Sequence, residues 1–167
     1  MEFAHISSRN LRAGFTMMEL IVVVILIGAL ATFAIPRFSS RVEFDARGFA
    51  DQTQGMLRYA QKLAIAQRRD VWVQIDQASG NICLTYIAFE PNCTTNLSTA
   101  TNPVLNPSDQ AWFKRSAPAG VSYSSSSSFR FSALGRPVPN STQTISLNGG
   151  ASSTVIVVES ETGYVHQ

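Results

Sequence analysis

The sequence predicts an α+β fold in which a long N-terminal helix packs on an antiparallel β-rich head. Three observations predict it. Residues 15–35 are almost entirely apolar, and a seven-residue recurrence of apolar side chains continues from Val42 to Leu63. The rest of the chain contains short strand-like segments separated by turn residues. Because the helical pattern precedes the strand pattern, helix and strands are expected to segregate.

The apolar run is long enough to cross a bilayer. Its only charged residue between positions 15 and 35 is Glu19, and at 1.5 Å per residue the run is about 30 Å long. Arg9 and Arg12 precede it, so its N-terminal end is expected in the cytoplasm and the head on the far side of the membrane. A secretory signal cleaved within residues 29–34 and an uncleaved signal anchor are alternatives.

The helical pattern continues beyond the apolar run. Pro36 is expected to kink the helix without ending it, which gives one helix from about Phe15 to Arg68. We expect residues 15–36 to be the membrane half and 37–70 the amphipathic half. The apolar stripe of the second half comprises Val42, Ala46, Phe49, Met56, Ala60 and Leu63, and the opposite face carries Arg41, Glu43, Arg47, Asp51, Arg58 and Lys62.

The head is predicted over residues 71–167. Its first two strands are separated by the turn-forming stretch "QASGN" and are expected to form a hairpin. Residues 90–120 contain four prolines among polar residues and are interpreted as a long surface loop that one short strand interrupts. The predicted strands are 71–76, 82–89, 112–114, 129–134, 143–148, 153–159 and 163–166.

Composition does not favour an enzyme. The chain is 14% charged with a net charge of +2, which does not favour nucleic acid or a strongly acidic partner. The only histidines are His5 and His166, and no pattern of catalytic, phosphate-binding or metal-binding residues is present. We therefore predict a non-enzymatic protein without a metal or cofactor.

The two cysteines, Cys83 and Cys93, lie close together in the sequence. In a short chain with an export-like N-terminus, such a pair indicates one disulfide formed in an oxidising compartment. Two buried free thiols are the alternative.

The stretch "GFTMMELIVVVILIGALATFAIPRF" resembles the N-terminus of a type IV prepilin or pseudopilin. The shared signature is a short basic leader ending in glycine, then Phe-Thr, two hydrophobic residues, Glu and a long apolar helix with a proline near its end. Here the hydrophobic pair is Met-Met, whereas most relatives have Leu-Val or Leu-Ile. The matching residues are Gly14, Phe15, Thr16, Met17, Met18, Glu19 and Pro36.

The resemblance implies processing and assembly. A prepilin peptidase would remove residues 1–14 by cleaving between Gly14 and Phe15, and the new Phe15 amine would be N-methylated. That cation would pair with Glu19 of a neighbouring subunit, which would offset the cost of placing an acid in lipid. The implied partners are other pilin subunits, the peptidase with its methyltransferase activity, and an inner-membrane assembly platform.

The resemblance also implies a helix kink. In filaments of this family the stretch between Gly28 and Pro36 is often partly unwound, and both residues are poor helix formers. For Gly28, simple tolerance of glycine in a membrane helix is the alternative.

A second resemblance lies in the C-terminal half. "FRFSALGRPVPNSTQTISL" and "STVIVVESETGYV" resemble the head of the H-type (GspH) pseudopilins and the FimT/FimU-type minor pilins, while "AQKLAIAQRR" and the early cysteine resemble MSHA-type biogenesis pilins. The same residues also fit ordinary turns at Gly135 and Gly163. The matching residues are Phe129, Phe131, Gly135, Arg136, Pro137, Ile145, Leu147, Thr162 and Gly163.

These resemblances predict a minor pilin that primes or joins a type IV pilus. A minor pseudopilin of a type II secretion system, a DNA- or ligand-binding pilin head, and an unrelated signal-anchored periplasmic domain are alternatives. Some FimT-type pilins bind DNA through a C-terminal Gly-Arg-x-Arg pattern, but residues 163–166 lack both arginines, so nucleic acid is disfavoured. A different basic patch stays open, formed by Arg68, Arg69, Lys114, Arg115, Arg130 and Arg136.

Overall fold

The computed structural model describes residues 15–88, 93 and 102–167, and within the helix it leaves the side chains of residues 32–40 undescribed. The chain divides into two compact units, Met1–Phe38 and Ser39–Gln167, which are considered separately below. The predicted cleavage residue Gly14 lies outside the described residues.

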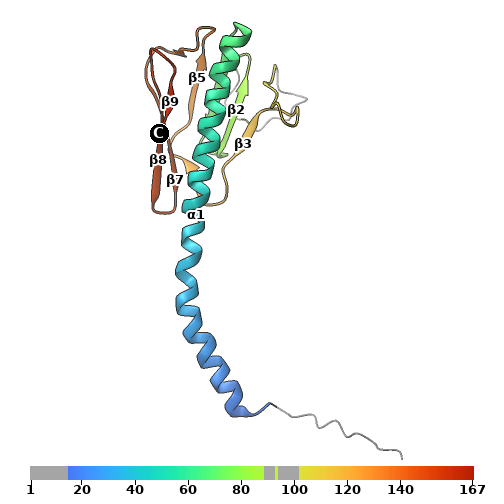
Figure 1. Ribbon diagram of the computed structural model, residues 1–167, viewed down its shortest axis with the longest axis vertical. Coiled ribbons are helices and arrows are strands. Elements are labelled where there is room, and N and C mark those ends of the chain that lie inside the picture. The colour runs from blue at the N-terminus through green and yellow to red at the C-terminus, as the bar shows by residue number, and fades with distance from the viewer. Residues whose placement is uncertain (1–14, 89–92, 94–101) are drawn as a thin grey trace, which may run out of the picture. The chain divides into compact units, whose positions relative to one another are not determined.

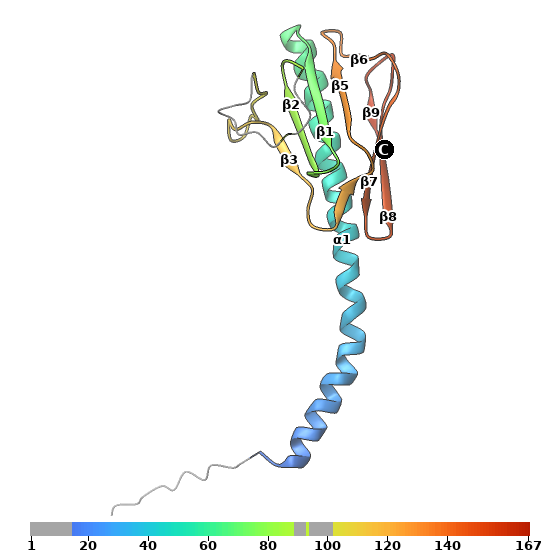
Figure 2. The ribbon, with the colours of Figure 1, turned by 180° about the vertical axis from the view of Figure 1, so that it is seen from behind.

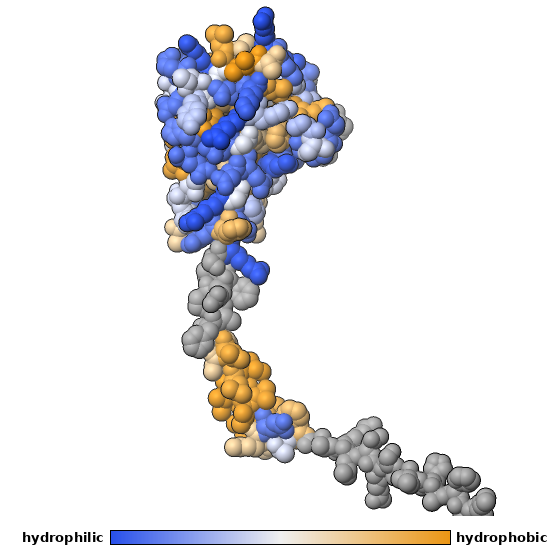
Figure 3. All heavy atoms as spheres, viewed as in Figure 1, coloured by the Kyte–Doolittle hydropathy of each residue, from blue (hydrophilic) through white to orange (hydrophobic). Residues whose placement is uncertain are grey.

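One long helix, α1, runs from Met17 to Gln67, close to the predicted bounds. Pro36 lies inside it and does not end it, as the sequence predicts, while the kink at Gly28 and Pro36 stays a prediction. Every described side chain from residue 15 to residue 31 is exposed, and Figure 3 shows hydrophobic side chains gathered over this part of the chain.

Within the part of the chain that the structure describes, no helix combines the length and the hydropathy that a membrane span requires. The membrane role of residues 15–36 therefore stays a prediction.

Within its described residues, the second unit contains nine strands in two antiparallel sheets (Figures 1 and 2). The five-stranded sheet has the order β3-β2-β1-β5-β6 and the four-stranded sheet the order β4-β7-β8-β9. The strands are β1 (Val71–Asp76), β2 (Asn81–Thr85), β3 (Lys114–Ser116), β4 (Val121–Tyr123), β5 (Ser127–Phe131), β6 (Pro137–Val138), β7 (Gln143–Gly149), β8 (Ser152–Val158) and β9 (Val165–His166).

The C-terminal part of α1 lies along the strands (Figures 1 and 2) and buries the predicted apolar stripe. Val42 and Leu63 at its ends are partly buried, and the four residues between them are buried. Alternate residues of the strands complete this core, among them Val73 and Ile75 of β1 and Phe129 and Phe131 of β5. The expected helix-on-sheet architecture is therefore present.

The sequence did not predict two of the strands, nor the division into two sheets. β4 has three residues and β6 two, so neither gives a detectable alternation of side chains. β3 begins at Lys114 and not at Trp112 as expected. Trp112 instead forms an isolated bridge with Leu105, within a segment that the sequence assigned to a loop.

Candidate assembly site and contacts of the head

The N-terminus of α1 is capped by Thr16. The Oγ1 atom of Thr16 accepts a hydrogen bond from the backbone N–H of Glu19 at 3.2 Å, and its carbonyl accepts one from Leu20 N–H at 3.2 Å. Thr16 is thus the N-cap residue and Glu19 the third helical residue, which are the positions of a capping box. A capping side chain satisfies a backbone donor that the helix itself leaves without a partner.

Glu19 therefore has a local reason for its place in the first turn. The positive end of the helix dipole favours a carboxylate there. The neighbouring apolar side chains have no such local partner, since Phe15, Met17 and Met18 are 70–82% exposed. Within the described residues, the chain offers an apolar helix with one acid at its start and no side chains that cover it.

Sequence reasoning missed the role of Thr16. It treated the residue only as part of a family signature, although Thr-x-x-Glu immediately before an apolar run is itself a capping signal. The signal was available in "TMMEL". The structure shows that two residues of the signature, Thr16 and Glu19, lie in direct hydrogen-bond contact.

In the head, Gln61 of α1 holds two turns together. Its Nε2 donates to the carbonyl of Gly135 at 3.1 Å and to the carbonyl of Thr162 at 2.8 Å. Gly135 lies in the turn between β5 and β6, and Thr162 in the turn between β8 and β9. One side chain thus connects the helix with both sheets, and we call this arrangement the Gln61 junction.

The glycines of the Gln61 junction permit this close approach. Gly135 and Gly163 have φ angles of +79° and +66°, which L side chains adopt at a cost. A Cβ on Gly163 would collide with the carbonyl oxygen of Gly135 and with Gln61 Nε2. Gly135, Thr162 and Gly163, three of the residues that carried the second resemblance, therefore serve the packing of the two turns.

Arg58 and Gln167 attach β9 to the exposed side of α1. The Arg58 guanidinium donates twice to the carbonyl of Val165, at 2.9 and 3.2 Å. The Gln167 side chain donates to Asp51 at 3.0 Å. The sequence placed Arg58 on the face opposite the apolar stripe, and the structure shows that it also fixes the last strand against the helix.

A second contact between α1 and the strands lies in the core. The hydroxyl groups of Thr53 and Tyr123 are 3.2 Å apart, and the ring of Tyr123 packs on Phe49 with centroids 5.7 Å apart. Burial raises the pKa of Tyr123 well above its usual value, and the hydrogen bond with Thr53 partly opposes this. Tyr123 is therefore a neutral hydrogen-bonding group of the core.

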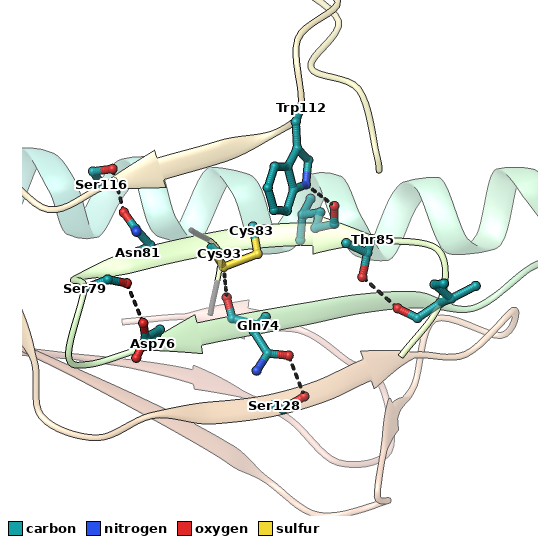
Figure 4. The surroundings of a disulfide bond; sticks show 12 residues. Gln74, Asp76, Ser79, Asn81, Cys83, Thr85, Cys93, Trp112, Ser116 and Ser128 are labelled. Atoms are coloured by element: carbon teal, nitrogen blue, oxygen red, sulfur yellow. Dashed lines mark hydrogen bonds between the residues drawn. A yellow bond between two sulfur atoms is a disulfide. The ribbon is translucent and has the colours of Figure 1, made fainter. Parts of the chain in front are cut away.

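Figure 4 shows the disulfide between Cys83 and Cys93, which the sequence predicted. Both cysteines are buried and form a small cluster with Trp112, whose indole N–H donates to the carbonyl of Leu84 at 2.9 Å. The Cys93 sulfur lies 3.6 Å from the carbonyl oxygen of Gln74 on the neighbouring strand. The bridge therefore holds Cys93 against the outer face of the five-stranded sheet.

A cleft of about 270 Å³ lies on the head between β1 and the start of β5. Its carboxylate, Asp76, accepts hydrogen bonds from Ala78 N–H at 3.1 Å and Ser79 Oγ at 2.5 Å, so it stabilises the β1–β2 turn. Gln74, which also lines the cleft, accepts from Ser128 at 3.1 Å. Among the described residues, no three His, Cys, Asp or Glu side chains lie close enough to hold a metal.

Five of the six cations of the alternative basic patch contact an acidic or aromatic side chain of the head. Arg130 lies 2.9 Å from Asp70 and over the ring of Trp72, and Arg69 lies over Tyr86. Lys114, Arg115 and Arg136 likewise approach Trp112, Phe113 and Glu161. These five side chains therefore form ion pairs or pack on aromatic rings within the head, and their contacts add no support for a nucleic-acid interface.

The comparisons with known proteins agree with this architecture. The GspH family, described as type II transport protein GspH, matches residues 49–163, which is well over half of the chain. No curated protein matches by sequence.

Two kinds of solved structure share the fold. The type IV minor pilin FimU of Pseudomonas aeruginosa PAO1 is 18% identical, with a TM-score of 0.54, and the match covers 77% of this chain and 90% of FimU. The minor pseudopilin EpsH from the type 2 secretion system of Vibrio cholerae is 12% identical, with a TM-score of 0.54, and the match covers 73% of this chain and 94% of EpsH. With its match over residues 49–163, the chain belongs to the GspH family, and its helix and two-sheet head have the fold of FimU and EpsH.

Proposed function

We propose that this chain is a structural, non-enzymatic subunit that primes or joins a type IV pilus. One observation carries the proposal: a single helix links a GspH-type head, which has its own core, to an exposed apolar segment. Thr16 caps the start of that segment, and Glu19 lies in its first turn. A filament subunit needs such a segment, because its apolar side chains must be covered by other subunits or by lipid.

The proposed maturation follows the prepilin signature. A prepilin peptidase removes residues 1–14 by cleavage between Gly14 and Phe15, and the Phe15 amine is then methylated. Residues 15–36 anchor the subunit in the bacterial inner membrane, with the amphipathic half (37–70) and the head (71–167) in the periplasm, until the assembly platform transfers the subunit to the filament.

Within the filament, we propose that Glu19 pairs with the methylated amine of Phe15 on a neighbouring subunit. Glu19 belongs to the first turn of α1, where its backbone N–H donates to Thr16, so the start of the helix is defined before a partner arrives. In an apolar environment an ion pair is far less costly than a lone charge. The proposed kink between Gly28 and Pro36 would then adjust the path of the helix, and Gly28 has open space around it.

Maturation is tested by the intact mass and N-terminal sequence of the protein purified from its host membranes. We expect a chain that starts at methylated Phe15. Substituting Gly14→Val should leave the leader attached, because a side chain there crowds the peptidase site. A mature chain that starts at Met1, or near residues 32–35, would contradict the proposal.

The pairing of Glu19 is tested by comparing two variants. Glu19→Gln preserves a residue type that completes a capping box but removes the charge, whereas Glu19→Ala removes both. If pairing governs assembly, both variants should be inserted and cleaved normally but incorporated into filaments at least about tenfold less. Normal incorporation of Glu19→Gln would mean that capping, and not charge, is what the filament requires.

The second candidate is a minor pseudopilin of a type II secretion system. The match to the GspH family and the likeness to EpsH favour it specifically. Deletion of the gene in the host separates the two functions. We expect surface pili to be lost while secretion of exported enzymes persists, and the reverse result would assign the chain to the secretion machine.

A further inference from the structure

The cleft between β1 and the start of β5 contains a buried amide group that the head uses only in part. Gln74 is 7% exposed and lines the cleft. Its Oε1 accepts the hydrogen bond from Ser128 Oγ at 3.1 Å, whereas its Nε2 has no hydrogen-bond partner among the described residues. Figure 4 shows this nitrogen on the side of the amide away from Ser128. A nearly buried side chain thus offers an unused donor to the cleft.

The place of this amide follows from the alternation of side chains along β1. Val73 and Ile75 are buried in the core, so Gln74 and Asp76 belong to the opposite face of the five-stranded sheet. Gln74 lies opposite Ser128 in the register of β1 and β5. Polar residues on the outer face of a sheet are usually well exposed, but Gln74 and Asp76 are only 7% and 9% exposed. Both line the cleft, so they present their polar atoms to it from a nearly buried position.

The other polar groups of the cleft supply donors and acceptors side by side. Ser126 Oγ accepts a hydrogen bond from Gln77 N–H at 2.9 Å and keeps its own proton as a donor. Ser128 Oγ donates to Gln74 and keeps its lone pairs as acceptors. The Asp76 carboxylate accepts two hydrogen bonds within the β1–β2 turn and has further lone pairs.

This mixture of polar groups selects a neutral ligand that is rich in hydroxyl groups. A hydroxyl both donates and accepts, so neighbouring hydroxyls can use neighbouring donors and acceptors. Asp76 is the only charged residue among the described residues that line the cleft, and it would repel an anion. A metal ion would find a single carboxylate whose two oxygens already accept hydrogen bonds, whereas such ions take six or more oxygen ligands.

We propose that this cleft binds a sugar unit through Gln74, Asp76 and Ser126. Gln74 Nε2 donates to one sugar hydroxyl, and the Asp76 carboxylate accepts from another. The volume of about 270 Å³ lies just below the range of about 300–1,000 Å³ that is usual for drug-sized ligands, which suits a single ring. None of the described residues that line the cleft is aromatic, so we expect weak binding, with a Kd of about 1–10 mM.

The binding role goes beyond the proposed function, and only its accessibility rests on that function. α1 packs against the core face of the five-stranded sheet, so Gln74 and Asp76 lie on the face turned away from the helix. In a filament whose subunits cover α1, as proposed above, this face would remain open to sugars. The sugar unit can be a free monosaccharide or the end of a glycan chain, and the test includes both.

The test uses the full chain in micelles of lauryldimethylamine oxide, because a detergent with a sugar headgroup would compete. The probes are glucose, galactose, mannose and N-acetylglucosamine, each as the free sugar and as its methyl glycoside. Saturation-transfer NMR from protein to sugar measures the Kd, and ¹⁵N-labelled glutamine reports the side-chain amide of Gln74. We expect at least one probe to bind with a Kd of about 1–10 mM and to shift the Gln74 amide signal.

The methyl glycosides separate the two sources of the sugar unit. The methyl group occupies the position of the next sugar in a glycan chain. Tighter binding of the methyl glycoside would assign the cleft to the end of a chain, and tighter binding of the free sugar would assign it to a monosaccharide. Either result supports the proposal.

A first pair of variants tests the buried amide. Gln74→Met removes the donor but keeps an unbranched side chain of similar length, and it should weaken binding at least about tenfold. Gln77→Met is the matched control, because Gln77 is exposed and does not line the cleft, and it should change the Kd by less than about twofold. The loss of one amide signal in Gln74→Met also identifies the Gln74 signal.

A second pair of variants keeps the proposal testable if Gln74→Met does not fold. Ser126→Leu removes a hydroxyl of the cleft and fills part of its volume, so it should weaken binding at least about tenfold. Ser125→Leu is its control, because Ser125 lies next to Ser126 but does not line the cleft. Both serines are exposed, and thermal unfolding of both variants establishes that the head is folded.

Three results would overturn the proposal: no saturable binding of any probe up to about 100 mM, equal losses in Gln74→Met and Gln77→Met, or equal effects of Ser126→Leu and Ser125→Leu. A saturable shift of the Gln74 signal by Ca²⁺, with none by any sugar, would also overturn it and identify a cation site. Because none of these measurements involves pilus assembly, their failure would leave the proposed filament function standing.

Discussion

The two halves of α1 obtain their stability from different sources. From residue 17 to residue 31 every side chain is exposed, including Leu26 at 56% and Leu30 at 68%, whereas Phe49, Met56 and Leu57 in the second half are at most 2% exposed. Both halves are rich in apolar residues. Among the described residues, the head covers the apolar side chains of the second half, and none covers those of residues 17–31. Under the proposed function, other subunits or lipid would cover the first half.

The largest expected effect uses one glycine from each region. Gly163→Ala should lower the free energy of unfolding of the head by about 3 kcal/mol, because the new Cβ meets the Gly135 carbonyl and the backbone has a positive φ. Gly28→Ala should change helix stability by about 1 kcal/mol at most, in the favourable direction, because open space surrounds it.

During thermal unfolding of the full chain in micelles, near-UV circular dichroism follows the head and measures Gly163→Ala, and far-UV circular dichroism follows the helix and measures Gly28→Ala. Equal, small effects would mean that the Gln61 junction is looser than its geometry indicates. The head and the exposed segment of residues 17–31 would then differ less in how tightly their side chains are packed.

The next largest effect concerns Gln61 itself. Gln61→Ala removes two hydrogen bonds and leaves two carbonyls without this partner, so we expect a loss of about 2 kcal/mol in the free energy of unfolding. The neighbouring Lys62 is exposed, and Lys62→Ala should cost less than about 0.5 kcal/mol. If the two variants unfold alike in the same assay, Gln61 does not couple the two sheets.

A smaller effect is expected at the buried pair of hydroxyl groups. Thr53→Val leaves the Tyr123 hydroxyl without its partner and should cost about 1–2 kcal/mol. Adding Tyr123→Phe to Thr53→Val should change the free energy of unfolding little further, because the double variant has no buried hydroxyl group left without a partner at this site. A double-mutant cycle of denaturant unfolding measures this coupling, and strict additivity would contradict it.

The smallest effect is a pH dependence at β9. His166 Nε2 lies 2.9 Å from Glu159 Oε1, and this hydrogen bond, together with the Gln167 carbonyl, raises the pKa of His166 above its usual value. Because the pKa of His166 is higher in the folded state, protonated His166 stabilises the fold. This contribution is complete below the unfolded-state pKa of about 6.5, and it is lost as the pH rises through the folded-state pKa.

The melting temperature should therefore fall slightly as the pH rises from about 6.5 through the raised folded-state pKa of His166. The matched control is Glu159→Gln, in which this part of the pH dependence should disappear. An identical pH dependence in both proteins would remove His166 as its source.

Much of the head was predictable from the sequence where segments are long and periodic. The amphipathic part of α1 gave a clear seven-residue recurrence, and β1, β7 and β8 gave clear alternation, so their positions were predicted within about one residue. β4 and β6 are too short to carry a period. Their pairing with β7 and β5 depends on residues far away in the chain.

The candidate site was predictable in part. The signature pointed to Glu19, and a Thr-x-x-Glu cap could have been found in the same letters, since a cap is a local interaction. The two hydrogen bonds of Gln61 could not be found in this way, because they join residues 74 and 101 positions apart. Nothing in the composition around Gln61 indicates which turns approach it.

The sequence by itself determined the long helix, its change from apolar to amphipathic, the disulfide pair and the family, because each rests on local spacing or on one compact motif. Only the tertiary structure decided that the strands divide into two sheets, that Gln61 connects them, and that β9 pairs with only the last two residues of β8. These properties depend on which strands pair and where each pairing stops. Such contacts form between distant residues, and a periodicity read along one segment contains no information about its neighbour in space.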